Sequence, residues 1–181
     1  PVELVVDNFI EVEHTPSVHA VLGYPLERLH EVTCRVTALE DRVRVYNVGP
    51  QRELPWPLGK LYGVPRGALF VDDWTVYFSP LHAVYEQYFL DGHTRRRVGD
   101  PLRIAVFFTP VNERETDLFV FAYGGAHPLG AMGLNLARMA LTRALVRLEV
   151  SRDAALLGEI GDGEVTLKGH ALGRFDKALS A

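Results

Sequence analysis

The chain has 181 residues, of which 48% are hydrophobic and 23% charged, and its formal net charge is -4. This size and composition predict one globular domain over residues 1–181 with a sizeable core. The basic residues form no stripe that would bind phosphates, and no apolar run reaches the roughly 20 residues needed to span a bilayer. We therefore expect neither nucleic acid nor a membrane as a partner.

Cys34 is the only cysteine. A single cysteine excludes an internal disulfide and indicates a reducing compartment, for which the cytoplasm is the expectation. It also excludes an iron–sulfur cluster held by this chain alone, because even a Rieske cluster needs two thiolates and two histidines.

The first third of the chain combines a short helix, a hairpin and a loop. The pattern over residues 5–15 predicts a helix that Pro16 ends or kinks. Two alternating apolar runs, residues 30–38 and 42–49, predict a β-hairpin. Residues 49–67 contain four prolines and four glycines, so they are expected to be mostly loop.

The rest of the chain changes from strand to helix periodicity. Residues 68–80, 82–92, 102–111 and 117–125 are rich in β-branched and aromatic residues and predict antiparallel strands. From about residue 129 to 160 the period becomes 3.6, which predicts one long helix or two abutting ones. This order indicates an α+β domain with a curved antiparallel sheet packed on a long C-terminal helix. Such a helix-grip (Bet v 1-like) arrangement leaves an apolar cavity between helix and sheet.

Two histidines follow the first predicted helix, in the stretch DNFIEVEHTPSVHA (residues 7–20). Asp7, Glu11 and His14 are spaced to share one helical face. His19 leaves that face on a continuous helix, but a break at Pro16 can fold it back toward His14. The pair is then a plausible metal clamp, and ordinary surface or capping histidines are the alternative.

An acidic residue interrupts the apolar stripe of the last predicted helix. Val146, Val150, Leu157 and Ile160 form the stripe, and Asp153 falls within it. A carboxylate that points into a core is costly unless it is hydrogen-bonded, paired or bound to a cation. Two histidines and one carboxylate on one side of a metal form the facial triad of non-heme Fe(II) oxygenases. The spacing alone does not distinguish iron from zinc.

Several segments resemble a known family. The pattern Asn-x-x-acid-x-x-His-x-x-x-x-His, here Asn8, Glu11, His14 and His19, resembles the mononuclear-iron signature of the Rieske-type ring-hydroxylating oxygenases, in their vanillate-demethylase-like branch. Residues 106–123 resemble that branch's sheet segment, and SRDAALLGEI (residues 151–160) resembles the helix that delivers its third ligand. Only the catalytic half of such an oxygenase is represented, so the N-terminal Rieske 2Fe-2S domain is expected to be absent from this chain.

The resemblance implies a mononuclear iron site and its partners. His14, His19 and Asp153 would bind one Fe(2+), and Glu11 would replace the family's bridging aspartate, which carries electrons from a neighbouring subunit's 2Fe-2S cluster. The implied reaction is O2-dependent hydroxylation or oxidative demethylation of a small aromatic or apolar substrate. A ferredoxin or reductase would donate the electrons, and a head-to-tail homotrimer would bring cluster and iron together.

Two other functions fit the same residues. A metal-free helix-grip carrier of an apolar ligand accounts for the sheet and the long helix, but gives the two histidines and Asp153 no role. A zinc hydrolase would use the same three ligands with an activated water. Seven strand aromatics are candidates to line the cavity: Trp74, Tyr77, Tyr85, Tyr88, Phe107, Phe119 and Phe121.

Overall fold

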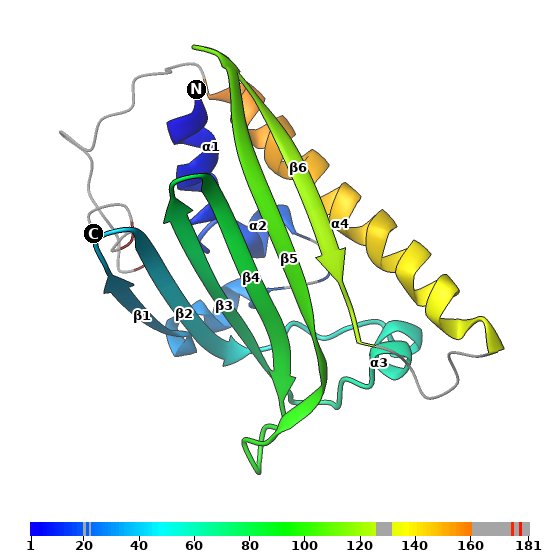
Figure 1. Ribbon diagram of the computed structural model, residues 1–181. Coiled ribbons are helices and arrows are strands. Elements are labelled where there is room, and N and C mark those ends of the chain that lie inside the picture. Colours follow the sequence, from blue (N-terminus) through cyan, green and yellow to red (C-terminus); the bar gives the residue numbers. More distant parts are fainter. Residues whose placement is uncertain (20, 22, 126–131, 161–174, 176–177, 179–181) are drawn as a thin grey trace.

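The computed structural model describes residues 1–19, 21, 23–125, 132–160, 175 and 178. Along these ranges short helices come first, the strands follow with one further short helix between the second and the third, and a long helix comes last (Figure 1). The elements are α1 (Val2–Phe9), α2 (Thr15–Val18), the 3-10 helix η1 (Leu26–Glu31), β1 (Thr33–Ala38), β2 (Arg42–Pro50), α3 (Trp56–Tyr62), β3 (Leu69–Phe78), β4 (Leu81–Leu90), β5 (Arg97–Asn112), β6 (Glu115–Tyr123) and α4 (Leu134–Glu159).

The six strands form one sheet in sequence order, β1-β2-β3-β4-β5-β6, and every neighbouring pair is antiparallel. The helices α1, α2 and α4 lie on one side of this twisted sheet (Figure 1). The predicted α+β class, with an antiparallel sheet and a C-terminal helix, is confirmed, and the arrangement is compatible with a helix-grip fold. Both strands of the predicted hairpin are present as β1 and β2.

The helix predicted over residues 5–15 is wrong in its extent. α1 ends at Phe9, and Pro16 lies in the first turn of the separate helix α2. Ile10 and Val12 are both buried in the core. Residues two apart lie on nearly opposite sides of a helix but on the same side of an extended chain. An extended segment between the two helices therefore buries both side chains, which one continuous helix cannot do.

The stretch predicted as loop, residues 49–67, contains the helix α3. Its first turn contains Pro57, and it ends at Gly63, whose φ of 66° is left-handed. Proline in a first turn and glycine just after a last turn are ordinary signals of helix start and stop. The abundance of proline and glycine in this stretch concealed them.

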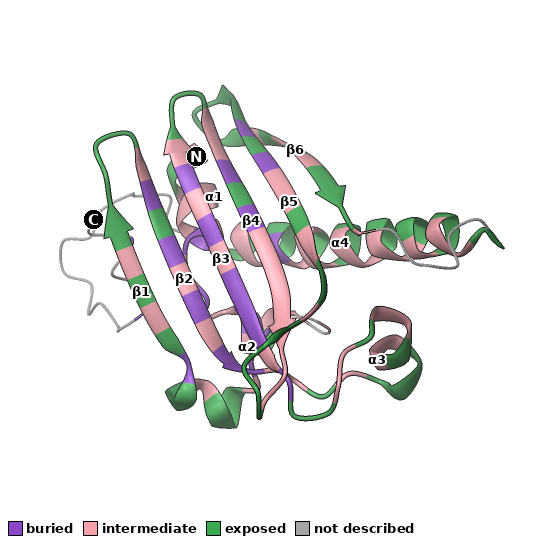
Figure 2. Ribbon diagram, turned by 60° about the horizontal axis from the view of Figure 1, so that its bottom comes forward, coloured by how far each residue is buried: buried purple, intermediate pink, exposed green. Residues whose placement is uncertain are grey.

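The core lies between the sheet and the helices on its inner side. Side chains of β2, β3, β4 and β5 alternate, so that Val45, Trp74 and Tyr85 form part of one buried row across the sheet. Figure 2 shows the burial concentrated in β2 and β3. Phe9 of α1 meets Phe108 of β5 edge to face, with ring centroids 5.4 Å apart. These contacts fix α1 against the sheet just before the two histidines.

α4 is a single helix of 26 residues. Val146, Val150 and Leu157 are half-buried as the stripe predicts, whereas Ile160, at the end of the helix, is 44% exposed. The chain from Gly161 onward lies outside the described residues except for Phe175 and Ala178. Among the helices that the structure describes, none combines the length and apolar character needed to cross a bilayer.

Five of the seven strand aromatics named as candidates to line the cavity do not face the inner side of the sheet. Only Trp74 and Tyr85 are buried on the inner face. The other five candidates occupy the alternate positions of their strands and point to the outer face, because successive side chains of a strand point in opposite directions. On that outer face the rings of Tyr77, His82 and Phe107 stack in register. The five outward residues are Tyr77, Tyr88, Phe107, Phe119 and Phe121.

Candidate metal centre

His14 and His19 flank the one-turn helix α2. His14 is its N-cap residue in helical conformation, and His19 is its C-cap in extended conformation, with φ -84° and ψ 141°. One helical turn followed by a change of direction brings the two rings together, with centroids 5.1 Å apart and planes at 81°. The predicted approach of His19 to His14 therefore occurs in the structure.

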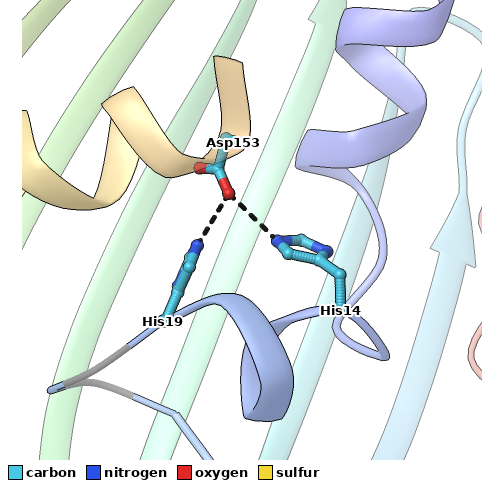
Figure 3. Close-up of side chains that lie close together, drawn as sticks. All are labelled: His14, His19 and Asp153. Carbon is cyan, nitrogen blue, oxygen red and sulfur yellow. Dashed lines mark hydrogen bonds and ion pairs between the residues drawn. The ribbon is translucent and has the colours of Figure 1, made fainter. Parts of the chain in front are cut away.

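Asp153 reaches the two histidines from α4, far along the chain (Figure 3). Its Oδ1 lies 2.9 Å from His19 Nε2 and 3.4 Å from His14 Nε2. The side chain faces inward and the residue is only 5% exposed, as the stripe predicts. One ligand atom from each of the three residues lies within 4.8 Å of the others, and this is the group among the described residues that could hold a metal ion.

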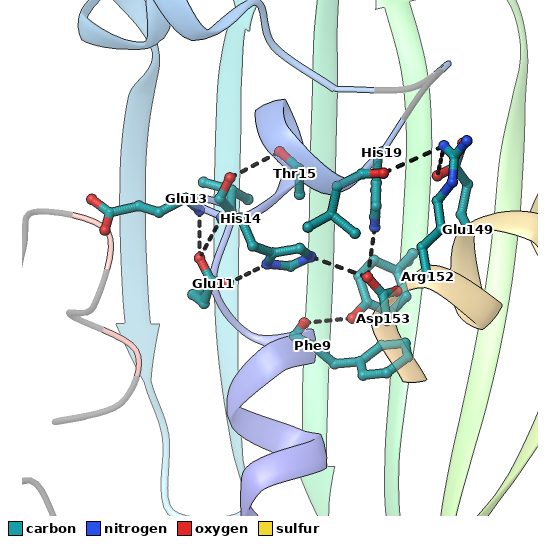
Figure 4. Close-up of polar contacts among 12 residues, drawn as sticks. Phe9, Glu11, Glu13, His14, Thr15, His19, Glu149, Arg152 and Asp153 are labelled. Carbon is teal, nitrogen blue, oxygen red and sulfur yellow. Dashed lines mark hydrogen bonds and ion pairs between the residues drawn. The ribbon is translucent and has the colours of Figure 1, made fainter. Parts of the chain in front are cut away.

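Glu11 holds the other side of the His14 ring. Its Oε1 contacts His14 Nδ1, and its Oε2 accepts the backbone N–H groups of Glu13 and, at 3.3 Å, of His14 (Figure 4). A carboxylate at Nδ1 retains the proton there and leaves Nε2 directed at Asp153 and His19. Glu11 thus occupies the position that orients a metal-ligating histidine.

Two arginines fix the backbone of the short helix. Arg52, after β2, donates to the carbonyls of Pro16, at 2.6 Å, and of His19. Arg152, beside Asp153 on α4, donates to the carbonyl of Val18 at 3.3 Å. Carbonyl groups at a helix end need such partners. An open depression of about 510 Å³, lined by residues 16–19 with Arg52, Arg152 and Ala155, borders His19.

The electrostatics of the site follow from the pairing of buried charges. Burial lowers the pKa of His14, but the carboxylates of Asp153 and Glu11 outweigh burial and raise the pKa to about 9. Burial raises the pKa of Asp153, but His14 and His19 outweigh it and lower the pKa to about 2. In the metal-free protein a protonated His14 therefore compensates the buried Asp153 carboxylate.

The geometry and chemistry of this cluster fit a divalent metal ion. His14 Nε2 is buried and makes no hydrogen bond to any described residue. Two ligand atoms that each lie about 2.1 Å from an ion, in directions at right angles, are roughly 3 Å apart. Asp153 Oδ1 lies 2.9 Å from His19 Nε2 and 3.4 Å from His14 Nε2, close to that separation. Imidazole and carboxylate suit both Fe(II) and Zn(II). The three residues would thus hold an ion on one side and leave its other side open.

Comparison with known proteins gives no match. No family model, no curated protein and no solved structure is similar to this chain. The geometry of His14, His19, Asp153 and Glu11 therefore carries the functional argument, and membership of the Rieske-type oxygenases stays a prediction.

Sequence reasoning missed a buried acid on the inner face of the sheet. Asp72 of β3 is buried, and burial raises its pKa to about 6, although a hydrogen bond from Gln87 and the charges of His19 and His14 act against the rise. The signal was available in the sequence FVDDWTV. Of two successive acids in a strand between apolar residues, one must point inward.

Glutamine in place of Glu11 is expected to lower the affinity for Fe(II) or Zn(II) by about 10- to 100-fold, the usual loss when a partner of a metal-bound histidine is removed. The amide keeps the shape of the side chain but cannot carry the charge that holds the His14 ring. Metal titration against a chelating dye measures the effect. Glu13→Gln is the control, because Glu13 is exposed and turned away from the rings (Figure 4). Equal losses in the two variants would mean that Glu11 does not orient His14.

Proposed function

We propose that this chain is the catalytic domain of a mononuclear non-heme Fe(II) oxygenase that hydroxylates or oxidatively demethylates a small aromatic or apolar substrate. The observation that carries the proposal is the convergence of His14, His19 and Asp153 at one buried point, with Glu11 against His14. A carboxylate buried between two imidazoles is expensive to maintain. A cation bound by all three groups would balance that cost.

Each side chain has a distinct task under this proposal. The Fe(II) ion, when bound, supplies the activation of O2. His14, His19 and Asp153 bind on one side only and so leave room for O2 and substrate. Glu11 holds the Nδ1 proton of His14. Apolar residues of the inner sheet face, such as Trp74 and Val45, keep water from the site.

Glu11 also lies where an external electron donor could reach it. Its side chain is 17% exposed and contacts the ring of His14, which is 12% exposed. A carboxylate between the protein surface and a metal ligand can dock a donor's histidine on one side and the ligand on the other. Under the proposal, the donor is a 2Fe-2S Rieske cluster on a separate domain or neighbouring subunit of a homotrimer, itself reduced by a ferredoxin or reductase.

The first test is the metal itself. Protein purified without oxygen is loaded with Fe(II) alone or with Zn(II) alone, and with Fe(II) it is expected to bind about one iron per chain, whereas His14→Ala binds none. Plasma emission spectrometry measures both metals. His82→Ala is the matched control, because His82 stacks between Tyr77 and Phe107 on the outer face of the sheet.

The outcomes separate the candidate functions. A protein that binds Zn(II) but takes up no Fe(II) would reject the oxygenase in favour of a zinc hydrolase with the same three ligands. Absence of metal from both the wild type and the His82 variant would reject metal chemistry altogether and favour an apolar-ligand carrier. Iron retained by His14→Ala would show that the ion binds elsewhere.

A further inference from the structure

Three polar side chains form one row across the inner face of the sheet. Asp72 of β3 pairs with Asn47 of β2 on one side and with Gln87 of β4 on the other. The rows on either side are apolar. One contains Val45, Trp74 and Tyr85, and the next contains Gly49, Phe70 and Phe89. Alternation along the strands places all three polar side chains on the side that faces the helices and the metal cluster.

This polar row is incompletely satisfied by the protein. Gln87 Nε2 donates to Asp72 Oδ1 at 3.0 Å. Asn47 is fully buried, and neither its Oδ1 nor its Nδ2 has a hydrogen-bond partner among the described residues; Gln87 Oε1 also lacks one. Each buried polar atom without a partner costs about 1–3 kcal/mol, so folded proteins contain few of them. Several in one row indicate a site that receives its partners from a ligand.

Two tyrosines flank the row: Tyr85 belongs to one adjacent apolar row, and Tyr24 packs on Phe70 of the other, with ring centroids 5.6 Å apart. The charge of Asp72 contributes to the raised pKa values of Tyr24 and Tyr85, and the charges of His14 and His19 act in turn on Asp72. Tyr24 is buried, and its hydroxyl makes no hydrogen bond within the described part of the chain. The polar row therefore lies within electrostatic reach of the candidate metal site, on the face of the sheet that the helices cover.

The balance of donors and acceptors defines the ligand chemistry. Asp72 provides carboxylate oxygens, and Asn47 and Gln87 each add an amide oxygen without a partner. The donors without a partner are the Asn47 amide, the Tyr24 hydroxyl and the indole N–H of Trp74 in the adjacent row. A hydroxyl or amino group can donate to the acceptors of the row, and a hydroxyl can also accept from these donors. A carboxylate cannot donate, and it would place a second negative charge beside Asp72 in a buried site.

We propose that Asn47, Asp72 and Gln87 bind a hydroxyl or amino group on the substrate and exclude substrates whose polar group is a carboxylate. This inference rests on the proposed oxygenase function and narrows its substrate class to phenols, aryl alcohols, aryl amines and similar neutral or cationic compounds.

A tryptophan of the sheet can report binding at this site. The chain has two tryptophans, of which Trp56 on α3 is 66% exposed and Trp74 is buried two residues from Asp72 on the same face. Trp56→Phe leaves Trp74 as the only indole. In this background, the change in Trp74 fluorescence gives a dissociation constant for each of four probes. The probes are benzyl alcohol, benzylamine, benzoate and toluene. Titrations of both metal-free and Zn(II)-loaded protein are needed, with metal content determined on the same samples.

The expected result is tighter binding of benzyl alcohol and benzylamine than of benzoate, by about tenfold or more, with toluene weaker than benzyl alcohol. Asp72→Asn is expected to reduce the discrimination against benzoate to about threefold or less. Asp73→Asn is the matched control, because Asp73 carries the same charge on the next residue but faces outward and pairs with Arg44 at 2.6 Å. It should behave as the wild type.

A second variant keeps the test valid if Asp72→Asn does not fold. Gln87→Leu is expected to reduce the preference for benzyl alcohol over toluene, because one acceptor of the row is gone and the half-buried position tolerates leucine. The proposal is overturned if no probe binds, if benzoate binds as tightly as benzyl alcohol, or if the Asp72 and Asp73 variants have equal selectivity. Selectivity in a protein that binds no metal would reject the oxygenase but retain the polar subsite. Metal binding without selectivity would reject the subsite alone.

Discussion

Replacement of Asp153 by alanine is expected to lower the affinity for Fe(II) by more than about 100-fold. Removal of a hydrogen-bond partner of a metal-bound histidine lowers metal affinity by up to about 100-fold, and a direct ligand contributes more than such a partner. Asp153 supplies the only carboxylate oxygen within reach of both Nε2 atoms in the described cluster. Without it two neutral imidazoles remain, which bind a divalent ion weakly. Equilibrium dialysis with metal analysis measures the loss.

Two further variants make this result interpretable. Asp153→Asn keeps the volume of the side chain and a hydrogen-bonding oxygen near the rings, so it should stay folded and still bind metal poorly. Glu159→Ala removes an exposed acid from the last turn of the same helix and should leave the affinity unchanged. Circular dichroism confirms that each variant is folded. If Asp153→Asn is folded and binds as much metal as the wild type, Asp153 is not a ligand.

The metal affinity is expected to increase steeply with pH. His14 has a pKa of about 9 in the metal-free protein and must lose its proton before its nitrogen can bind a cation. Below pH 9 the apparent affinity should therefore rise about tenfold per pH unit, and about one proton should be released per ion bound. Asp153, with its pKa lowered to about 2, is already ionised over this range. Calorimetry in buffers of different ionisation enthalpy measures the released proton.

The stability of the metal-free protein provides the control for this pH dependence. The contribution of His14 to the free energy of unfolding is fully present below its unfolded pKa of 6.5 and is lost as the pH rises through 9. The contribution of Asp153 is present above 3.8 and is lost as the pH falls through 2. Unfolding by urea should thus show a loss of roughly 2 kcal/mol between pH 6.5 and 9 without metal. A metal affinity that is flat between pH 6 and 8 would contradict the pairing of His14 with Asp153.

Most of the sheet could be predicted from the sequence because alternation in a strand is a local property. Each strand carries its own pattern of period 2, and the breaks at Gly, Pro and Asn mark its ends. The assignment of faces was harder. Seven aromatics on the strands were candidates to line the cavity, but five of them lie on the outer face, because one residue of register decides which face a side chain occupies.

The three candidate metal ligands were identified in the sequence by two separate signals. His14 and His19 stood close together with a proline between them, and Asp153 interrupted an apolar stripe. Neither signal depends on the path of the chain between them. The end of α1 did depend on the tertiary structure. The helix ends at Phe9 because Ile10 and Val12 are both buried in the core, and only packing against the sheet decides that.

The sequence by itself determined the fold class, the choice of the two histidines and Asp153, and the inward direction of Asp153. Only the tertiary structure decided that these groups meet at one point, that Glu11 holds His14, and that Asn47, Asp72 and Gln87 form one row beside them. The physical reason is that periodicity gives the direction of a side chain relative to its own helix or strand. The distance between two elements depends on strand register and on how the helices pack across the sheet.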